Sequence, residues 1–377
     1  MKKKGKLLIC ILLSGVLLLS FSTACPAEET VAQELSLQQA VDKAIELSKT
    51  LKVAKTEKEK AKEQRSNAQE AVSYEPTGNI NPTLQTAYST LLQTELNYQI
   101  KSRSLEALQD DIKAEVVEKY CAVLSAQVAN STAKQSLKNA EWQYTAAMAQ
   151  LRVGMLAPTT QVAVEAALEQ AKSGLAQSEE ALNKAYVELN SLVGFMPDTR
   201  AQLVTNIPFE KLQVDSITAD VSRAIANNTD VWKALQAVII ERQDLRMEIQ
   251  PYEVEKLEIE IAEFTADEAK DKLEEALTLL YHDINTLESG IQAAEQGVAA
   301  AEQALATAKL RFDVGMATQG DVIKAQTELD TAEKTLAELK YNHATALSAY
   351  RNLTGKDVLP VVAQEDGIQE GDVQEAI

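Results

Sequence analysis

The chain of 377 residues has few of the residues that build turns, aromatic cores or disulfide frameworks. It contains 13 glycines, 8 prolines and 3 cysteines, and aromatic residues make up only 5% of it. Many-stranded sandwiches and barrels need frequent Gly and Pro turns, so the composition argues against those folds. Ala, Leu, Glu, Gln and Lys dominate instead, and these residues are strong helix formers. The composition predicts an all-α fold.

Side chains that carry enzyme chemistry or bind metals are equally scarce. The two histidines (His282 and His343) and the cysteines show no metal-ligand spacing, and Cys121 has the pattern of a buried core residue. The sequence has no nucleophile elbow, phosphate loop or zinc signature. We therefore expect no catalytic residue, no metal and no cofactor. We interpret both histidines as packed or lumen-facing side chains, and Trp142 and Trp232 as packing between helices.

Basic residues are outnumbered by acidic ones. The chain has 37 Lys and Arg against 56 Asp and Glu, which gives a formal net charge of −19. Nucleic-acid binding needs basic patches, and anionic lipid surfaces attract basic segments. The charge therefore argues against a nucleic-acid partner.

The N-terminus has the pattern of an export signal. Four lysines within the first six residues precede an apolar run from Leu7 to Leu19, and small residues lead from there to Cys25. We interpret residues 1–24 as a signal peptide, so the mature chain is exported. Ser22-Thr23-Ala24-Cys25 resembles a bacterial lipobox, in which Cys25 would become the lipidated first residue. Ordinary cleavage after Ala24 or Ala27 is the alternative.

Two parts of the chain repeat each other. Leu37–Ala54 aligns without gaps on Ile217–Ala234, at an offset of 180 residues. Val153-Gly154-Met155 matches Val314-Gly315-Met316 at an offset of 161, and this register continues to Gly194 and Gly355. Such self-similarity indicates one structural unit used twice. We assign residues 35–193 to the first helical repeat and residues 217–355 to the second.

Three further segments flank or join the repeats. Residues 25–34 are an N-terminal linker, and residues 194–216 contain two prolines and few periodic hydrophobic residues, which predicts a second linker. Residues 356–377 are acidic and are predicted to be disordered.

Within each repeat the hydrophobic period is that of coiled helices. Apolar or small residues recur every three or four positions from Leu168 to Leu192 and from Leu329 to Leu353. A spacing that averages 3.5 residues makes helices supercoil around one another. The sequence therefore predicts two tandem repeats of long coiled-coil hairpins.

The turns and breakers divide each repeat into helices. We expect first helices over residues 35–72 and 217–249, followed in each repeat by a long helix. The long helix placed at residues 84–151 contains neither Pro nor Gly and would be on the order of 100 Å long. Gly154 and Gly315 then mark sharp turns, and each is followed by a helix of about 35–40 residues.

The second hairpin carries a family motif. The segment Leu310-Arg-Phe-Asp-Val-Gly-Met-Ala-Thr-Gln-Gly-Asp-Val-Ile-Lys-Ala-Gln-Thr-Glu-Leu329, with Asn352-Leu-Thr-Gly355, resembles the outer-membrane efflux proteins of the TolC family. Residues 35–45 resemble that family's opening helix. The resemblance implies a homotrimer whose six hairpins close a helical tube across the bacterial periplasm. Solutes would reach it from an inner-membrane pump and a periplasmic adaptor protein.

The resemblance also assigns roles to individual residues. The family's hairpin tips, which meet the adaptor, match two sets of residues here: Val153, Gly154, Met155 and Thr159, and Val314, Gly315, Met316 and Thr318. Asp321 matches an aspartate of the pore gate found in some members. The plain alternatives are a helix corner capped by glycine and an acidic residue stabilised at a helix N-terminus.

The chain departs from the family between the first two helices of each repeat. Family members insert two membrane β-strands there, which together with a turn need at least ~20 residues. Ser73–Thr83 is too short for such a pair, and in the second repeat only Leu257–Ile261 alternates as one strand would. We expect the membrane barrel to be missing or vestigial, with at most short residual strands. A lipid on Cys25 or a reduced barrel would then attach the protein to the membrane.

Two functions of different class follow from these patterns. The first is an efflux-type exit duct in the cell envelope, at the outer membrane or at a membrane surface that faces the periplasm. The second is a lipid-anchored structural or adaptor coiled-coil protein that conducts nothing. The duplicated hairpin tip favours the first function, and the missing barrel favours the second.

Overall fold

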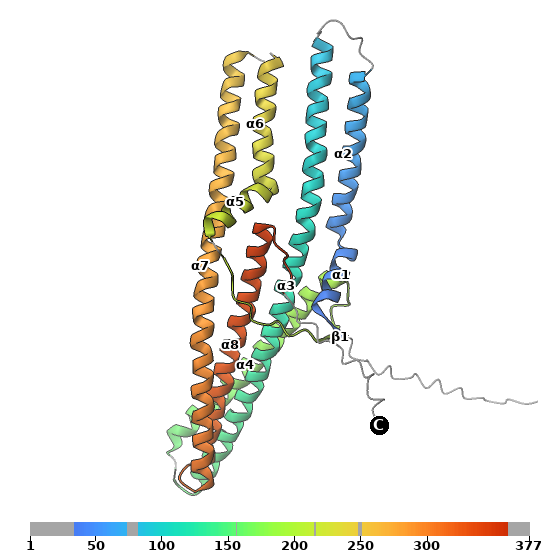
Figure 1. The fold of residues 1–377 in the computed structure, drawn as a ribbon. Helices are drawn as coiled ribbons and strands as arrows, with labels where there is room; N and C mark the ends of the chain where they lie inside the picture. Colours follow the sequence, from blue (N-terminus) through green and yellow to red (C-terminus); the bar gives the residue numbers. More distant parts are fainter. Residues whose placement is uncertain (1–33, 74–81, 156, 215, 248–250, 361–377) are drawn as a thin grey trace, which may run out of the picture.

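The computed structural model describes residues 34–73, 82–155, 157–214, 216–247 and 251–360, and these form an almost wholly helical molecule (Figure 1). The all-α prediction is confirmed. In these ranges the elements are β1 (Glu34–Leu35), α1 (Leu37–Leu47), α2 (Lys49–Ser73), α3 (Pro82–Arg152), α4 (Pro158–Val193), β2 (Gln202–Leu203), α5 (Ile217–Asn227), α6 (Thr229–Met247), α7 (Tyr252–Asp313) and α8 (Gln319–Thr354).

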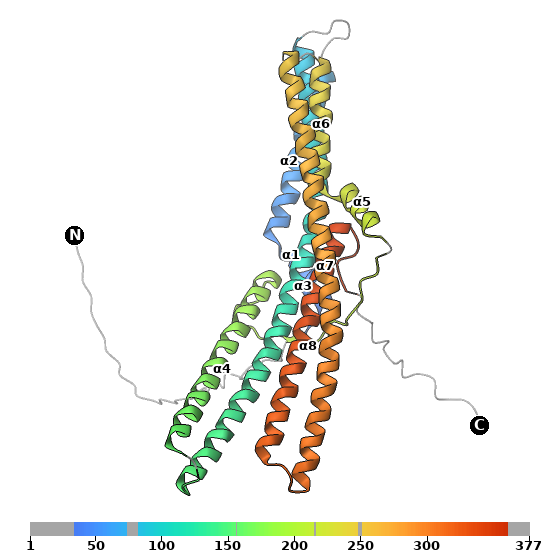
Figure 2. The same cartoon turned by 90° about the vertical axis from the view of Figure 1, so that its left-hand side faces the viewer.

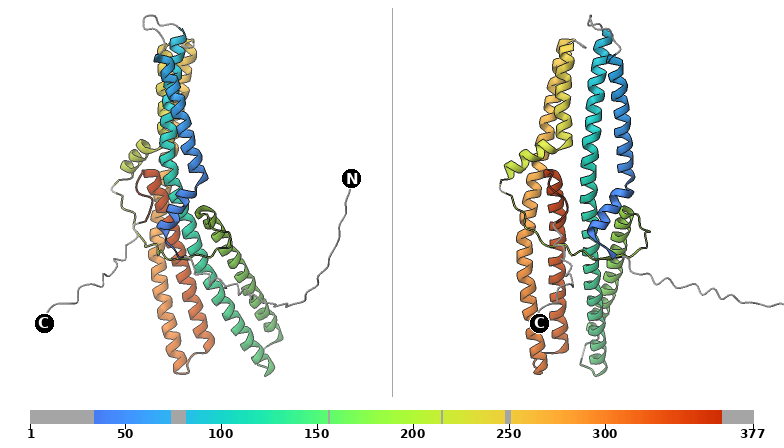
Figure 3. Two further views of the ribbon diagram at one scale, coloured as in Figure 1. Left: turned by 90° about the vertical axis from the view of Figure 1, so that its right-hand side faces the viewer. Right: turned by 45° about the vertical axis from the view of Figure 1, so that its right-hand side comes forward.

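Two long helices, α3 and α7, run nearly the whole length of the molecule, and the shorter helices pack beside them in two tiers. In the upper tier α2 pairs with α3 and α6 pairs with α7, whereas in the lower tier α4 pairs with α3 and α8 pairs with α7 (Figures 1 and 3). Helix α3 also packs against α6 above and α8 below, so each tier is a layer of four helices. The two lower hairpins diverge toward their tips (Figure 2).

Four glycines in the left-handed conformation end the helices of the lower tier. Gly154 and Gly194 have φ of 71° and 72°, and Gly315 and Gly355, which lie 161 residues further on, have φ of 75° and 66°. A residue with a Cβ avoids this conformation, so glycine is favoured at all four positions. The same offset relates the corners in the structure and the repeats in the sequence.

The first helix of each repeat is broken in two, so the prediction of continuous helices over residues 35–72 and 217–249 is wrong. The breaks fall at Ser48 and Asn228, which have extended ψ values of 115° and 127°. The Ser48 hydroxyl accepts a hydrogen bond from the backbone N–H of Leu51 at 3.1 Å, and the Asn228 side-chain oxygen accepts from that of Val231 at 3.0 Å. Each side chain caps the next helix, which favours a new start over continuation.

The strand considered for Leu257–Ile261 is also wrong, because this segment lies in the first turns of α7. Leu257 and Ile261 are four residues apart and therefore share one exposed face of the helix. A five-residue alternation does not distinguish a strand from a helix by itself, and the long helical pattern that follows decides the outcome. The other interruption lies mostly in residues 74–81, outside the described residues.

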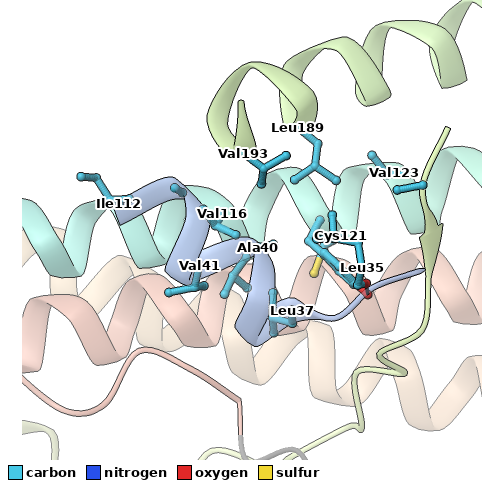
Figure 4. Packing of buried hydrophobic residues seen from close by; sticks show 14 of the residues in the cluster. Leu35, Leu37, Ala40, Val41, Ile112, Val116, Cys121, Val123, Leu189 and Val193 are labelled. Atoms are coloured by element: carbon cyan, nitrogen blue, oxygen red, sulfur yellow. Dashed lines mark hydrogen bonds between the residues drawn. The ribbon is translucent and has the colours of Figure 1, made fainter. Parts of the chain in front are cut away.

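The main core lies at mid-length, where α1 crosses α3 and the upper end of α4. Leu37, Ala40 and Val41 of α1 pack against apolar side chains of α3 and α4 (Figure 4). Cys121 is buried in this core, as predicted. A second cluster joins α5, α6, α7 and α8.

The segment between the repeats is tied to this core. Its strand β2 pairs in parallel with β1, with Leu35 opposite Leu203. The Tyr120 hydroxyl of α3 donates to the carbonyl of Leu35 at 3.1 Å and accepts from the backbone N–H of Thr205 at 3.0 Å. One buried phenol therefore connects both strands to the long helix.

Residues 1–24, Cys25 and residues 361–377 lie outside the described residues, so their predicted roles stay predictions. The prediction of disorder over residues 356–377 is wrong for residues 356–360, because Val358 is buried and Lys356 pairs with Asp220 at 3.1 Å. Within the described ranges, none of the helices combines the length and the apolarity needed to cross a membrane.

Candidate functional site

The two matched Val-Gly-Met corners lie at the same end of the molecule (Figures 1 and 3). Their apolar side chains point into solvent: Val153 and Met155 are 69% and 79% exposed, and Val314 and Met316 are 69% and 81% exposed. Four large apolar side chains at one end of a helical rod are more than soluble surfaces usually leave uncovered. This lower end is the candidate site.

Each corner is closed by backbone hydrogen bonds across the end of the helix. Met155 N–H donates to the Gln150 carbonyl at 2.9 Å, and Met316 N–H donates to the Arg311 carbonyl at 2.7 Å. A Cβ at Gly154 or Gly315 would meet no atom within 4 Å. Glycine is therefore needed for its backbone conformation and not for space.

The helices that leave the two corners begin differently. Thr318 caps α8: its hydroxyl accepts from the N–H of Asp321 at 3.3 Å, and the Asp321 carboxylate accepts from the N–H and the hydroxyl of Thr318 at 2.8 Å. These bonds lower the pKa of Asp321. Ala157 caps α4 without a side-chain bond and is followed by Pro158. Asp321 is thus an exposed acid at a helix N-terminus, and its gate role stays a prediction.

The second lower hairpin has an apolar seam, and a polar contact joins the two hairpins near their tips. Leu305 of α7 packs against Ala325 and Leu329 of α8 inside the second hairpin. Between the hairpins, the Asn139 amide of α3 donates to the Thr327 hydroxyl of α8.

Both tryptophans lie along this joint between the hairpins. The Trp142 ring covers Gly320, where a Cβ would come within 3.1 Å of the ring, and Arg103 of α3 stacks 4.5 Å from the ring centroid of Trp232 on α6. The predicted packing roles of both residues are confirmed.

His343 is a packed side chain, as predicted. It is 1% exposed, lies 3.5 Å from the Glu288 carboxylate, and its ring centroid is 4.9 Å from that of Phe209. Burial lowers its pKa more than Glu288 raises it, so the imidazole is neutral at pH 7. Across the described ranges, no three His, Cys, Asp or Glu side chains are arranged to hold a metal ion.

Sequence reasoning missed an acidic cluster near the upper end of the α6–α7 hairpin. It consists of Glu241 and Asp244 of α6 with Glu255 and Glu258 of α7. Burial, followed by the neighbouring carboxylates, raises the pKa of both Glu241 and Asp244, and Ser89 of α3 donates to Asp244 at 3.5 Å. Each acidic residue of α6 lies as many residues before the end of α6 as its neighbour lies after the start of α7. The position of the α6–α7 turn in the sequence is therefore the signal that would have predicted the cluster.

A family model matches part of the chain. Residues 252–356, which span α7, the second corner and α8, match the model described as outer membrane efflux protein. This part of the chain is similar to outer membrane efflux proteins. The comparison with curated proteins finds no match.

Solved structures of outer-membrane proteins share the fold over most of this chain. The outer-membrane channel OprN has a TM-score of 0.66 at 14% identity, over 85% of this chain and 90% of that one. The outer membrane protein VceC from Vibrio cholerae has 0.62 at 14%, over 86% and 97%. The open state of the MtrE outer membrane channel of Neisseria gonorrhoeae has 0.61 at 17%, over 85% and 89%. The TolC-like fold expected from the hairpin motifs is confirmed.

Proposed function

We propose that this chain is the subunit of an efflux-type exit duct that exports solutes across the cell envelope. It would work with a periplasmic adaptor protein and an inner-membrane pump, at the outer membrane or a membrane surface facing the periplasm. The observation that carries the proposal is the pair of equivalent, glycine-closed corners exposing Val153, Met155, Val314 and Met316 at one end of the molecule. An adaptor that covers these tips would explain their exposure.

The arrangement of the helices supports a wall built from several copies. The outer helices of the lower layer carry exposed small residues. These residues are Ala163, Gly174 and Ala181 of α4 and Ala293, Gly297 and Ala300 of α7. A Cβ at Gly174 or Gly297 would meet no atom within 4 Å. Small residues allow close approach of a further helix, and three copies, the number that the family resemblance implies, would bring six hairpins into one tube.

Membrane attachment is the other part of the proposal. We propose that residues 1–24 are a signal peptide and that lipid carried by Cys25 anchors the exported chain. Mass spectrometry of the mature N-terminus tests this directly, because a lipidated Cys25 and an ordinary cleavage after Ala24 or Ala27 differ in mass. An unmodified N-terminus at or beyond Cys25 would overturn the anchor.

The oligomeric state and a crosslinking experiment test the duct. We expect the purified chain to be a trimer, and cysteines introduced by Met155→Cys and Met316→Cys to crosslink in cells to the adaptor encoded beside it. Leu279→Cys, another exposed apolar position on the same helix as Arg311 but far from the tips, is the control and should not crosslink. A stable monomer would remove the duct and leave the structural coiled coil, and trimers without tip crosslinks would remove the adaptor contact.

A further inference from the structure

The linker between the two repeats is fastened to both helices of the second lower hairpin. After β2 it runs past α8 to the start of α5, beside α7 (Figure 1). Glu210 of the linker pairs with Arg351 of α8, and the backbone N–H of Leu212 donates to the Glu288 carboxylate of α7 at 2.7 Å. We call residues 209–212 the strap.

A histidine is buried beneath the strap. His343 of α8 is 1% exposed, and the ring of Phe209 lies against it, with the two ring centroids 4.9 Å apart. Phe209 is itself 40% exposed, so its ring lies between the imidazole and solvent. The Nε2 atom of His343 lies 3.5 Å from the same Glu288 oxygen that accepts from the Leu212 N–H, which is too long for a strong hydrogen bond. The strap therefore covers an ionisable ring and binds the carboxylate beside it.

The charged groups that face this ring do not compensate for its burial. Burial is the largest influence on the pKa of His343 and lowers it from the ordinary value of 6.5. Glu288 of α7 and Glu210 of the strap act to raise the pKa, and Arg351 of α8 acts to lower it further. The covered site therefore favours the neutral ring. A protonated ring gains most from water, which reaches it once Phe209 moves away.

The first repeat shows that the helical hairpin does not require an ionisable pair at this place. The positions 161 residues before His343 and Glu288 are occupied by Leu182 and Gln127, neither of which titrates. Leu182 packs against the main core, and the Gln127 amide donates to the Tyr186 hydroxyl at 2.7 Å. The histidine and the glutamate therefore belong to the contact with the strap and not to the common backbone plan.

We propose that residues 209–212 form an acid-released strap, which is held on α7 and α8 while His343 is neutral and is lifted when His343 takes up a proton. With the strap lifted, water reaches the ring, which then titrates near its ordinary pKa of 6.5. The released state binds the proton more tightly than the covered state, so the strap is held fully above about pH 6.5 and is weakened as the pH falls below it. Release leaves residues 206–213 as a free tether between the two repeats. All of these contacts lie within one chain, so the strap works in a single copy as well as in an assembled duct.

Hydrogen exchange of the Leu212 amide in the full-length chain measures the release. Uptake of one proton per release should raise its exchange rate, corrected for the intrinsic rate, up to about tenfold between pH 7.5 and pH 5.5. The Thr205 amide, which donates to the Tyr120 hydroxyl in the same linker, is the internal control and should stay constant after the same correction. An unchanged rate at Leu212, or an equal rise at both amides, would overturn the proposal.

Exchanging residues between the repeats tests the role of His343. His343→Leu with Glu288→Gln gives the second repeat the side chains of the first, and the glutamine oxygen can still accept from the Leu212 N–H. This variant should hold the strap at pH 7.5 and lose the rise in acid, as should the smaller change His343→Gln. His282→Gln removes the other histidine of the chain, at an exposed position, and is the matched control that should keep the full rise. A rise that persists in either folded His343 variant, or that disappears in His282→Gln, would show that another group releases the strap.

Discussion

The two repeats share one backbone plan but hold their mid-length junctions together in different ways. Four equivalent positions carry Ala40, Lys43, Leu189 and Phe195 in the first repeat and Asp220, Arg223, Tyr350 and Lys356 in the second. In the first repeat Ala40 and Leu189 are buried in an apolar cluster, and Lys43 lies outside it, 4.3 Å from the ring centroid of Phe195.

In the second repeat the same place holds a buried carboxylate. Asp220 is 5% exposed and accepts hydrogen bonds from the Tyr350 hydroxyl at 2.8 Å, Lys356 at 3.1 Å and Arg223 at 2.6 Å. Burial acts to raise the pKa of Asp220, but these partners outweigh it, so the pKa is lowered. The duplicated fold therefore accommodates either an apolar or an ionic junction, provided that the buried carboxylate and the side chains that bind it occur together.

The largest effect on stability is expected from introducing a carboxylate into the first junction, which lacks the tyrosine and lysine that bind Asp220 in the second. Ala40→Asp buries a carboxylate where Leu189 and Phe195 replace the tyrosine and lysine of the second repeat. We expect a loss of about 4 kcal/mol in the free energy of unfolding, because the carboxylate would leave water without the tyrosine and lysine partners of Asp220. Thermal unfolding measures it.

Two variants make this test specific. Ala40→Asn, of similar size but uncharged, should lose less stability than Ala40→Asp. Adding Leu189→Tyr and Phe195→Lys to Ala40→Asp should recover part of the loss. If Ala40→Asp unfolds like the unaltered chain, the first junction is not a closed apolar cluster.

The second-largest effect on stability is expected from removing the Asp220 carboxylate from the second junction. Asp220→Ala leaves the Tyr350 hydroxyl and Lys356 without their acceptor, and we expect a loss of about 2 kcal/mol. This is less than the ~3–5 kcal/mol of fully buried pairs, because Lys356 and Arg223 remain partly exposed. Tyr350→Phe, which removes one hydrogen bond to a charged group, should cost about 1.5 kcal/mol.

The pH dependence of this loss follows from the lowered pKa of Asp220. The folded state holds the carboxylate ionised, so its stabilisation is complete above the ordinary pKa of 3.8 and is lost as the pH falls through the lowered value. Denaturant unfolding of wild type and Asp220→Ala should therefore differ fully at pH 7 and converge in acid. A difference that grows on acidification would contradict the network.

The upper end of the second repeat should respond to acid in the opposite direction. Burial raises the pKa values of Glu241 and Asp244, and the nearby carboxylates of Glu255 and Glu258 raise them further. The folded state binds protons more tightly there, so stability is lost as the pH rises from the ordinary carboxylate range through the raised values.

Hydrogen exchange in α6 measures this second response. After correction for the intrinsic rate, exchange around Glu241 should slow between pH 7 and pH 5, and Glu241→Gln with Asp244→Asn should remove that dependence. Exchange in α2, its counterpart in the first repeat, is the internal control. An equal change in α2 would mean that the whole molecule responds and the acidic cluster does not.

The features that could be predicted from the sequence are those that depend on residues close together in the chain. Gly154 and Gly315 sit in matching contexts, and the 3.5-residue spacing extends over enough turns to define the long helices. The breaks at Ser48 and Asn228 were missed because the hydrophobic pattern continues through them. The Asp220 network and the acidic cluster were missed because they join residues from different helices, which only the turns and packing bring together.

The smallest expected effect concerns the helix starts at the two tips, where one repeat is capped and the other is not. Thr318→Ala removes the hydroxyl that accepts from Asp321 N–H, and we expect a loss of about 1 kcal/mol. Ala157→Ser adds an acceptor at the equivalent start of α4 and should gain about 0.5 kcal/mol.

Both changes leave the glycine corners and the exposed Val and Met side chains as they are. Adaptor crosslinking at Met155→Cys and Met316→Cys should therefore stay unchanged while local hydrogen exchange in α4 and α8 shifts in opposite directions. If Thr318→Ala instead abolishes the crosslink with little change in exchange, then the threonine contacts the adaptor itself, and the two tips are unequal in binding as well as in capping.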